Sequence, residues 1–309
     1  MKKLRVIFMG TPVFAVPGLE ELINHTNVVL VVTAPDAFVG RKRVLTACPV
    51  KEAALTHGIE VFSPAKIRAD YEKIKELQPD IIITCAYGQI LSEAILNIPR
   101  LGCVNIHASL LPKYRGGAPI HHAIMNGETE TGITLFLMAP GMDDGDMLAK
   151  QAISISESDN LETLSSKLSS LGTKMLMDCL PVIIDGTVER IKQNHDEATF
   201  APIVLRADEH LDFTKTKEEV YNHIRAFAPA PLTYFVLDGI EYKIASAHKS
   251  EQKGKISTVA GVSKAGIVIG TSNGSIVVTK LKPFGKKAML VSDYLNGIKQ
   301  ETLLGKEVS

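Results

Sequence analysis

The stretch CVNIHASLLPKYRGGAP at residues 103–119 decides how this chain is expected to fold and where its chemistry lies. It opens with an apolar strand over residues 103–106 and brings Asn105 and His107 two positions apart. Side chains alternate between the two faces of a strand, so this pair should project together. An open parallel sheet binds its ligands at the carboxyl ends of its strands. We therefore expect the pair to face a binding crevice, while a purely structural Asn-x-His pair stays an alternative.

A second polar cluster lies downstream of this stretch. The turn Gly-Met-Asp-Asp-Gly-Asp at residues 141–146 holds three carboxylates and follows an apolar strand expected over residues 133–138. An amide, an imidazole and a carboxylate at neighbouring strand ends can polarise a carbonyl oxygen and move a proton. No second histidine stands at a metal-ligand spacing from His107, so we expect a site without metal.

The first half of the chain alternates between strand and helix patterns, which predicts an α/β fold with a doubly wound, mostly parallel, Rossmann-like sheet. The turn at residues 10–12 carries one glycine, so the G-x-G-x-x-G fingerprint of dinucleotide-binding enzymes is absent. Strands are expected at residues 4–9, 28–33, 60–62, 80–85 and 149–155, and helices at 14–23, 50–57, 67–77, 118–126 and 160–184.

The second half predicts a smaller β-barrel of the OB type. Thr216 and Glu219 form a capping box for a helix over residues 217–227, which the Ala-Pro-Ala-Pro run at 228–231 ends. Short strands are expected at residues 233–236, 242–247, 256–259, 266–270 and 275–281, followed by a closing helix at 286–298. This pattern divides the chain into a first domain at 1–189, a linker at 190–206 and a second domain at 207–309.

Charge is distributed unevenly along the chain. The 34 basic and 34 acidic residues cancel over the whole sequence, but eleven lysines face five acidic residues from Gly239 onwards. A basic barrel suits a nucleic-acid backbone, although a merely solvated lysine-rich surface is the alternative. Few aromatic residues accompany these lysines, so we expect phosphate contacts rather than base stacking. Arg41, Lys42 and Arg43 form a further basic cluster in a loop that could contact phosphates or simply be solvated.

Together these motifs resemble the folate-dependent formyltransferases. The resemblance rests on Asn105-x-His107, the Ser-Leu-Leu-Pro run at 109–112 and Asp143 in the acidic turn. It implies that Asn105, His107 and Asp143 are the catalytic residues. The amide and a protonated imidazole would hold the oxyanion of a tetrahedral intermediate, and Asp143 would favour the protonated imidazole and relay protons.

Three further segments are similar to the branch of this family that acts on methionyl-tRNA. They are Met-Gly-Thr-Pro at 9–12, Ala-Tyr-Gly at 86–88 and Lys-Lys-Ala-Met at 286–289. The segment 225–231 departs from that branch, because it has alanines where Asn and Trp are common. This departure touches none of the three catalytic positions.

The resemblance also implies ligands and partners. The donor would be 10-formyltetrahydrofolate, a co-substrate, and the acceptor would be initiator methionyl-tRNA. Donor-binding residues would be Ser109, Leu110, Leu111, Pro112, Tyr87 and Gly88, and tRNA-binding residues would be Arg41, Lys42 and Arg43.

Composition adds expectations about the setting. The four cysteines lie far apart without a C-x-x-C spacing, and no apolar run is long enough to span a membrane. We expect a cytoplasmic monomer that works without a membrane or a metal. Two alternatives stay open: a formyltransferase acting on another amine, such as an amino sugar nucleotide or glycinamide ribonucleotide, and an RNA-binding protein without catalysis.

Overall fold

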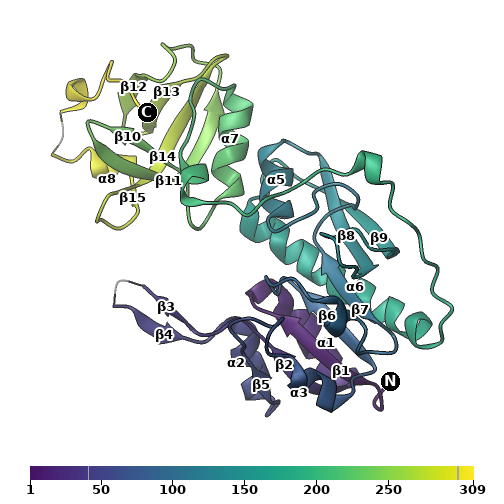
Figure 1. Cartoon of the computed structure of the whole chain (residues 1–309). Helices are drawn as coiled ribbons and strands as arrows, with labels where there is room; N and C mark the ends of the chain where they lie inside the picture. The colour runs from purple at the N-terminus through teal and green to yellow at the C-terminus, as the bar shows by residue number, and fades with distance from the viewer. Residues whose placement is uncertain (41, 298) are drawn as a thin grey trace. The chain divides into compact units, whose positions relative to one another are not determined.

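The computed structural model describes residues 1–40, 42–297 and 299–309 (Figure 1). The chain forms two units, each with its own sheet. The first unit comprises Met1–Pro119, Glu130–Ser154 and Ser165–Pro202, and the second comprises Ile120–Thr129, Ile155–Leu164 and Ile203–Ser309.

The first unit is built on a seven-stranded sheet in the order β5-β2-β1-β6-β7-β8-β9. The strands from β5 to β7 run parallel, and β8 and β9 are antiparallel to their neighbours. This confirms the predicted mostly parallel, doubly wound sheet. Its strands are β1 (Arg5–Gly10), β2 (Asn27–Val32), β5 (Val61–Phe62), β6 (Ile81–Cys85), β7 (Cys103–His107), β8 (Glu130–Leu137) and β9 (Met147–Ser154).

The central strands are buried because their sequences are continuous apolar runs, as expected for a sheet covered on both faces. Ile7, Met9, Leu30 and Ile82 are fully buried and share one core cluster. The helices that follow the strands are α1 (Val16–His25), α2 (Pro49–Thr56), α3 (Glu72–Leu77), α4 (Glu93–Leu96), α5 (Pro119–Met125) and α6 (Leu161–Ile184), with a 3₁₀ turn η1 (Val13–Ala15) before α1.

The second unit holds an antiparallel half-barrel, which confirms the predicted small β domain. Its strands lie in the order β10-β11-β14-β13-β12, and β15 pairs with β14. Val308 bridges to Leu237 and Glu307 bridges to Thr258, so the end of the chain lies along both open edges. The elements are α7 (Lys217–Ala226), β10 (Tyr234–Leu237), β11 (Ile240–Ser250), β12 (Val259–Ser263), β13 (Gly266–Gly270), β14 (Ser275–Pro283), β15 (Met289–Leu290) and α8 (Val291–Tyr294), with 3₁₀ turns η2 (His195–Glu197), η3 (Arg206–Glu209) and η4 (Gln300–Thr302) elsewhere along the chain.

Two helix starts are capped by side chains, and the first of them is the predicted capping box. Thr216 Oγ1 accepts from the Glu219 main-chain N–H at 3.2 Å, and Glu219 Oε2 accepts from the Thr216 N–H at 2.9 Å. Asn160 Oδ1 accepts from the Thr163 N–H at 2.9 Å at the start of α6. Each contact satisfies an amide that a helix end leaves unpaired.

Three predicted elements are wrong in extent. The closing helix at 286–298 is replaced by β15 and the short α8, because the main chain of residues 289–290 pairs with the free edge of β14; residue 298 lies outside the described residues. The strand expected at 256–259 begins only at Val259. The helix expected at 67–77 is helical only from Glu72.

Candidate active site

The structure places the catalytic candidates on one strand of the first sheet and in a turn next to it. Asn105 and His107 lie on β7, and Asp143 lies in the turn between β8 and β9. Asp143 Oδ2 is 3.7 Å from His107 Nδ1, and the two side chains are only 18% and 6% exposed. The sheet therefore brings together a buried imidazole and a carboxylate that are 36 positions apart in the sequence.

The orientation of the His107 ring is fixed by its other nitrogen. Nε2 lies 2.9 Å from the Tyr114 carbonyl oxygen. A carbonyl oxygen can only accept, so Nε2 carries a hydrogen and donates it. The Nδ1 edge is thus the one that faces Asp143, and any proton that the ring gains or loses does so at Nδ1. The ring of Phe136 stands edge-on to the imidazole, with centroids 6.2 Å apart.

Asn105 is oriented by a threonine on the adjacent strand. Thr84 of β6 is the register partner of Asn105, and its Oγ1 donates to Asn105 Oδ1 at 2.9 Å. This bond uses the amide oxygen and leaves the Nδ2 hydrogens as the donors that Asn105 can offer to a ligand. Thr84 is 3% exposed, so the contact is shielded from water.

Asp143 sits in a turn that only particular residues can build. Its carboxylate Oδ2 accepts from the Gly116 N–H at 2.7 Å, and its own φ is +48°. Gly116 has φ +119°, and a Cβ there would lie 2.7 Å from the Ala201 carbonyl oxygen. A Cβ on Gly145 would lie 1.7 Å from the Leu137 carbonyl oxygen. Glycine at these two positions therefore lets the Arg-Gly-Gly loop lie against the main chain of Ala201 and the acidic turn lie against the end of β8.

The predicted donor-binding segment 109–112 is held firmly beside this cluster. Ser109 Oγ donates to the Lys113 carbonyl at 2.6 Å, and the Leu111 N–H donates to Thr134 Oγ1 at 3.1 Å. Leu111 is fully buried and packs in a small core cluster with Phe136. The peptide bond between Leu111 and Pro112 is cis. The structure thus gives the Leu111 side chain a core role, while Leu110 is half-buried.

The turn at Tyr87 and Gly88 lies at the carboxyl end of β6, next to β1. Strand β1 has β2 on one side and β6 on the other, so the order of the strands reverses at β1. Open α/β sheets bind ligands beside such a switch point. The Tyr87 ring belongs to the core cluster under the turn, and burial raises the pKa of Tyr87 to about 12. Gly88 has φ +88°, as its place in the turn requires.

The basic loop forms a hairpin that the sequence did not predict. Strand β3 (Ala37–Val39) pairs with β4 (Val44–Thr46), and Figure 1 shows the ribbon projecting from its unit. The Arg43 guanidinium lies 5.2 Å from the centroid of the exposed Phe38 ring, and Lys42 is exposed. Arg41, the third predicted tRNA-binding residue, lies outside the described residues.

Two other buried groups near the site were missed by sequence reasoning. Gln193 and Arg115 are each 5% exposed and hydrogen-bond to one another. Gln193 lies in the segment expected to be a linker, where no periodicity marks a buried side chain. Arg115 lies within the stretch 103–119, where no pattern marks it as buried, and Thr84 lies within the strand expected at 80–85.

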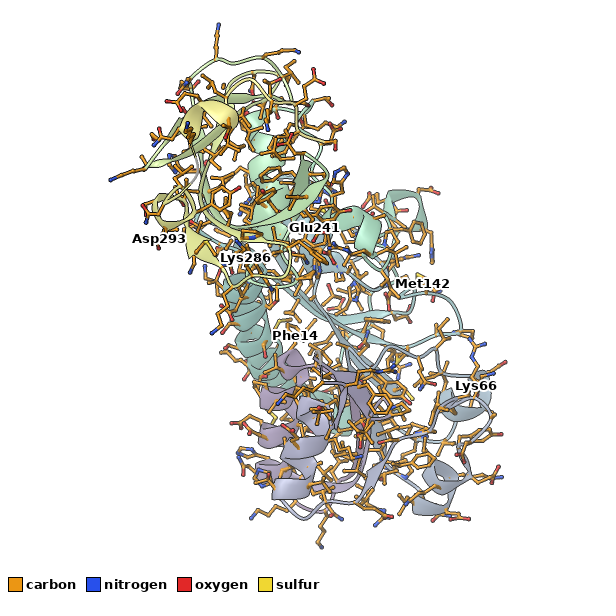
Figure 2. The ribbon with its side chains drawn as sticks, turned by 90° about the vertical axis from the view of Figure 1, so that its left-hand side faces the viewer. Phe14, Lys66, Met142, Glu241, Lys286 and Asp293 are labelled. Atoms are coloured by element: carbon orange, nitrogen blue, oxygen red, sulfur yellow. The ribbon has the colours of Figure 1, made fainter. Side chains whose placement is uncertain are left out.

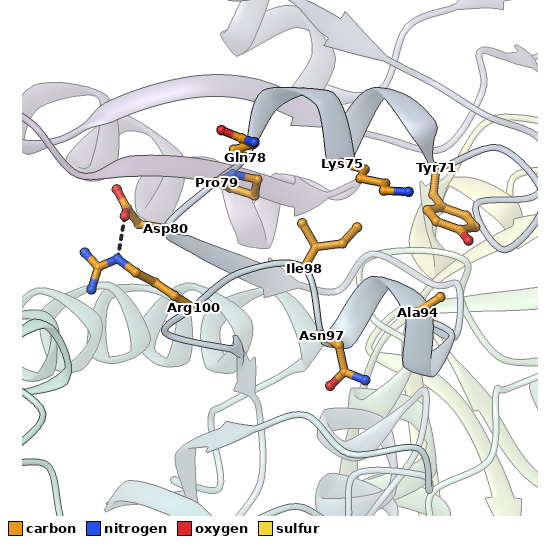
Figure 3. A pocket seen from close by; sticks show the side chains of 9 residues that line it. All are labelled: Tyr71, Lys75, Gln78, Pro79, Asp80, Ala94, Asn97, Ile98 and Arg100. Carbon is orange, nitrogen blue, oxygen red and sulfur yellow. Dashed lines mark hydrogen bonds and ion pairs between the residues drawn. The ribbon is translucent and has the colours of Figure 1, made fainter.

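A pocket of about 610 Å³ lies elsewhere in the first unit, between α3 and α4. Asp80 and Arg100 form an ion pair at its rim, with 2.8 Å between Oδ1 and Nε (Figure 3). Asp80 directly precedes β6, so this pocket is at the amino end of that strand and not at the catalytic candidates.

In the parts of the chain that the structure describes, no helix has the length and apolar character needed to cross a membrane.

Comparison with known families identifies the class of protein. Residues 2–180 match the formyl transferase family, and residues 204–299 match the formyl transferase C-terminal domain. Both halves of the chain are therefore those of a formyl transferase.

Individual relatives narrow the class. A methionyl-tRNA formyltransferase of Macrococcus caseolyticus is 46% identical over 299 residues, covering 96% of each chain. One of Bacillus subtilis is 46% identical over 299 residues, covering 95% of this chain and 94% of the relative. The chain belongs to the methionyl-tRNA formyltransferase family.

Solved structures with lower identity share the fold. The N-formyltransferase from Helicobacter canadensis, in complex with folinic acid and dTDP-3-aminofucose, has a TM-score of 0.68 at 21% identity, covering 90% of this chain and 99% of that one. HypX from Aquifex aeolicus has a TM-score of 0.65 at 17% identity, and the match covers 95% of this chain but 49% of that one.

Proposed function

We propose that Asn105, His107 and Asp143 catalyse transfer of the formyl group of 10-formyltetrahydrofolate to the amine of initiator methionyl-tRNA, giving N-formylmethionyl-tRNA for translation initiation. The observation that carries this assignment is the pairing of His107 Nδ1 with Asp143 Oδ2. His107 lies on β7, the strand that also presents Asn105. Relatives about 46% identical over nearly the whole chain bear the name of this activity.

The chemistry needs stabilisation of one negative charge. The neutral amine nitrogen of the methionyl group forms a bond to the formyl carbon, and the carbonyl oxygen becomes an oxyanion. We propose that Asn105 donates to this oxygen through Nδ2–H, and that a protonated His107 donates to it through Nδ1–H, since its Nε2–H is already bonded to the Tyr114 carbonyl. Removing one such donor typically costs about 3 kcal/mol of transition-state stabilisation. Because Thr84 holds the Asn105 oxygen, the amide is already turned for donation before the substrate arrives.

The reaction also moves one proton. The attacking amine must lose a proton, and the folate nitrogen must gain one when its bond to the formyl carbon breaks. Asp143 can accept and return that proton through its carboxylate, with His107 Nδ1 as its neighbour at 3.7 Å. The products are the formylated aminoacyl-tRNA and tetrahydrofolate, so atoms and charge balance without an added reductant or oxidant. The amide and imidazole fill the electrophilic role, and we propose that the reaction requires no metal ion.

The donor would lie along segments at the strand ends. Residues 109–112 and the turn at Tyr87 and Gly88 both lie at the carboxyl edge of the first sheet. Leu111 is in the core, so we assign donor contacts in its part of the segment to the main chain and to Leu110.

The acceptor tRNA would contact basic surfaces in both units. In the second unit, Lys280 and Lys282 are exposed at alternate positions of β14. The turn beyond it adds the exposed Lys287 and Lys286, of which Figure 2 labels Lys286. Phe284, between these lysines, is 77% exposed and offers a ring on which a base can stack. In the first unit, we propose that Arg41, Lys42 and Arg43 contact phosphates near the acceptor end.

We further propose that the first domain covers residues 1–189, the linker 190–206 and the tRNA-binding domain 207–309. Because its acceptor is charged tRNA, the enzyme would act in the cytoplasm, and we propose that it acts as a monomer. Light scattering of the purified protein with and without tRNA tests the last point.

Incubation with 10-formyltetrahydrofolate and charged initiator tRNA tests the activity itself. We expect release of tetrahydrofolate together with a mass increase of one formyl group on the methionyl ester. His107→Ala should lose most of this turnover while keeping the wild-type thermal transition. Formylation of an amino sugar nucleotide but not of methionyl-tRNA would transfer the assignment to the alternative acceptor. Near-normal turnover of His107→Ala would refute the catalytic cluster.

A further inference from the structure

The segment expected to be a linker forms hydrogen bonds to the main chain of the acidic turn that carries Asp143. Residues 188–202 have little regular structure, yet Gln193 within them is 5% exposed. A buried amide side chain is costly unless its polar atoms are paired. The groups that pair with the Gln193 amide therefore indicate the role of this segment.

Every hydrogen-bonding position of the Gln193 amide is used. Its Nε2 donates to the main-chain oxygens of Asp143 and Gly145, both at 2.8 Å. Its Oε1 accepts from Arg115 Nε at 3.1 Å and from Arg115 Nη2 at 2.7 Å. An amide has two donor hydrogens and two acceptor lone pairs, so Gln193 is fully satisfied by these four bonds.

The network closes on Asp143 from a second direction. Arg115 is followed by Gly116, whose N–H donates to Asp143 Oδ2 at 2.7 Å. Gln193 thus holds the main chain of Asp143 directly and its carboxylate through the Arg115–Gly116 loop. Arg115 Nη2 also donates to His195 Nδ1, at a distance of 3.3 Å.

The backbone of Asp143 needs such support. Its φ of +48° lies in the left-handed region, which costs a residue with a Cβ free energy unless its surroundings hold it there. The main-chain oxygens of Asp143 itself and of Gly145, two residues further on, bind the same Gln193 nitrogen. The distance of 3.7 Å from Asp143 Oδ2 to His107 Nδ1 depends on this conformation.

We infer that Gln193 is a positioning residue of the formyl transfer reaction: through the main chain of the acidic turn and through Arg115, it sets where the Asp143 carboxylate stands against His107. This inference rests on the catalytic role proposed above for Asp143. It assigns to the segment between the two domains a function in the chemical step, in addition to connecting them.

Two substitutions separate positioning from general support of the fold. Gln193→Met keeps the length of the side chain but removes all four hydrogen bonds. Gln193→Glu keeps the acceptor and gives Arg115 a carboxylate partner, but it places an oxygen against the main-chain oxygens of Asp143 and Gly145. We therefore expect Gln193→Glu to keep the thermal transition and yet displace the acidic turn. Gln151→Met makes the same chemical change at an exposed glutamine of the first unit and is the matched control.

The readouts are the kcat and KM of formyl transfer and the thermal transition. A displacement of about 1 Å in a catalytic group can cost 100-fold in rate. We expect Gln193→Met and Gln193→Glu to lower kcat by about 10–100-fold, with both KM values within about threefold of wild type. Gln151→Met should match wild type. Combining Gln193→Glu with Asp143→Asn should lose little more than Asp143→Asn alone, because both changes remove the same group.

The outcomes are distinguishable. If Asp143→Asn alone is near wild type, the proposed role of Asp143 fails and this inference with it. If Asp143→Asn is inactive but both folded Gln193 variants keep the wild-type kcat, only the inference is refuted. Fully additive losses in the double variant would refute it as well, since they would show that Gln193 acts independently of Asp143.

Discussion

Replacing Asp143 by asparagine tests the catalytic pair with a minimal change of shape. Asp143 Oδ2 accepts from the Gly116 N–H at 2.7 Å and faces His107 Nδ1 at 3.7 Å. Asparagine can put its own oxygen in the same place and keep the bond to Gly116, so the turn should stay folded. What disappears is the negative charge beside the imidazole.

The size of the loss follows from the distance between the two groups. Two unit charges 3.7 Å apart interact by roughly 4 kcal/mol at an effective dielectric constant near 20. Every 1.36 kcal/mol changes a rate by tenfold, so losing the whole interaction corresponds to about 1,000-fold in kcat. Charge develops only partly in a transition state, and we expect kcat to fall by about 100–1,000-fold. Single-turnover formylation of methionyl-tRNA at saturating donor measures this directly.

The control is the same substitution nearby. Asp146→Asn changes another carboxylate of the acidic turn, whose main-chain oxygen accepts from Leu137 and which is outside the pair with His107. It should stay within about threefold of wild type. Asp143→Asn with a rate in that same range, or equal losses in both variants, would show that the charge at Asp143 does not assist the chemistry.

Four further outcomes are expected. Thr84→Val should lower kcat about tenfold by releasing the Asn105 oxygen, whereas Thr84→Ser should restore it, as steady-state kinetics will show. Activity on a small amine surrogate should survive EDTA, and recovery that requires added zinc would contradict the metal-free chemistry. Lys286→Ser with Lys287→Ser should raise the KM for tRNA and flatten its salt dependence without changing the KM of the folate donor. Burial, with a smaller effect of a neighbouring histidine, lowers the pKa of His121 to about 4, so only the unfolded chain gains this proton between about pH 6.5 and 4. The unfolding free energy should therefore fall as the pH drops through that window, and His121→Asn should reduce this loss in denaturant titrations at pH 7 and 5.

Much of the fold could be predicted because periodicity and strand chemistry are local. The apolar runs that became β1, β6 and β7 are bounded by turns, and the strand–helix alternation leaves few topologies open. The placement of Asn105 and His107 followed from the two-residue repeat of a strand. Their approach to Asp143 was expected from the rule that parallel strands end at one edge, but that rule is not the reason for it. Strand β8 is antiparallel to β7 and ends at Leu137, opposite Val104, and the turn after β8 brings Asp143 back to His107.

Elements with weak local signals were harder to predict. Strands β3 and β4 are three residues each and pair only with one another in the part of the chain that the structure describes. Strand β15 exists because the edge of β14 accepts it, and nothing within residues 289–290 specifies that partner. Propensity alone therefore favoured a helix after residue 286, and tertiary pairing decided against it.

The supports of the catalytic residues are the least predictable part, for a physical reason. Gln193 reaches Asp143 across 50 residues and Arg115 across 78, and Thr84 meets Asn105 across 21. These contacts need particular donors and acceptors at particular places, but they impose no repeat on the sequence around them. A search for the residues that make this site work must therefore start from the hydrogen-bond partners of the buried polar groups around it, and substitutions chosen only from the catalytic motif would leave the position of Asp143 unexplained.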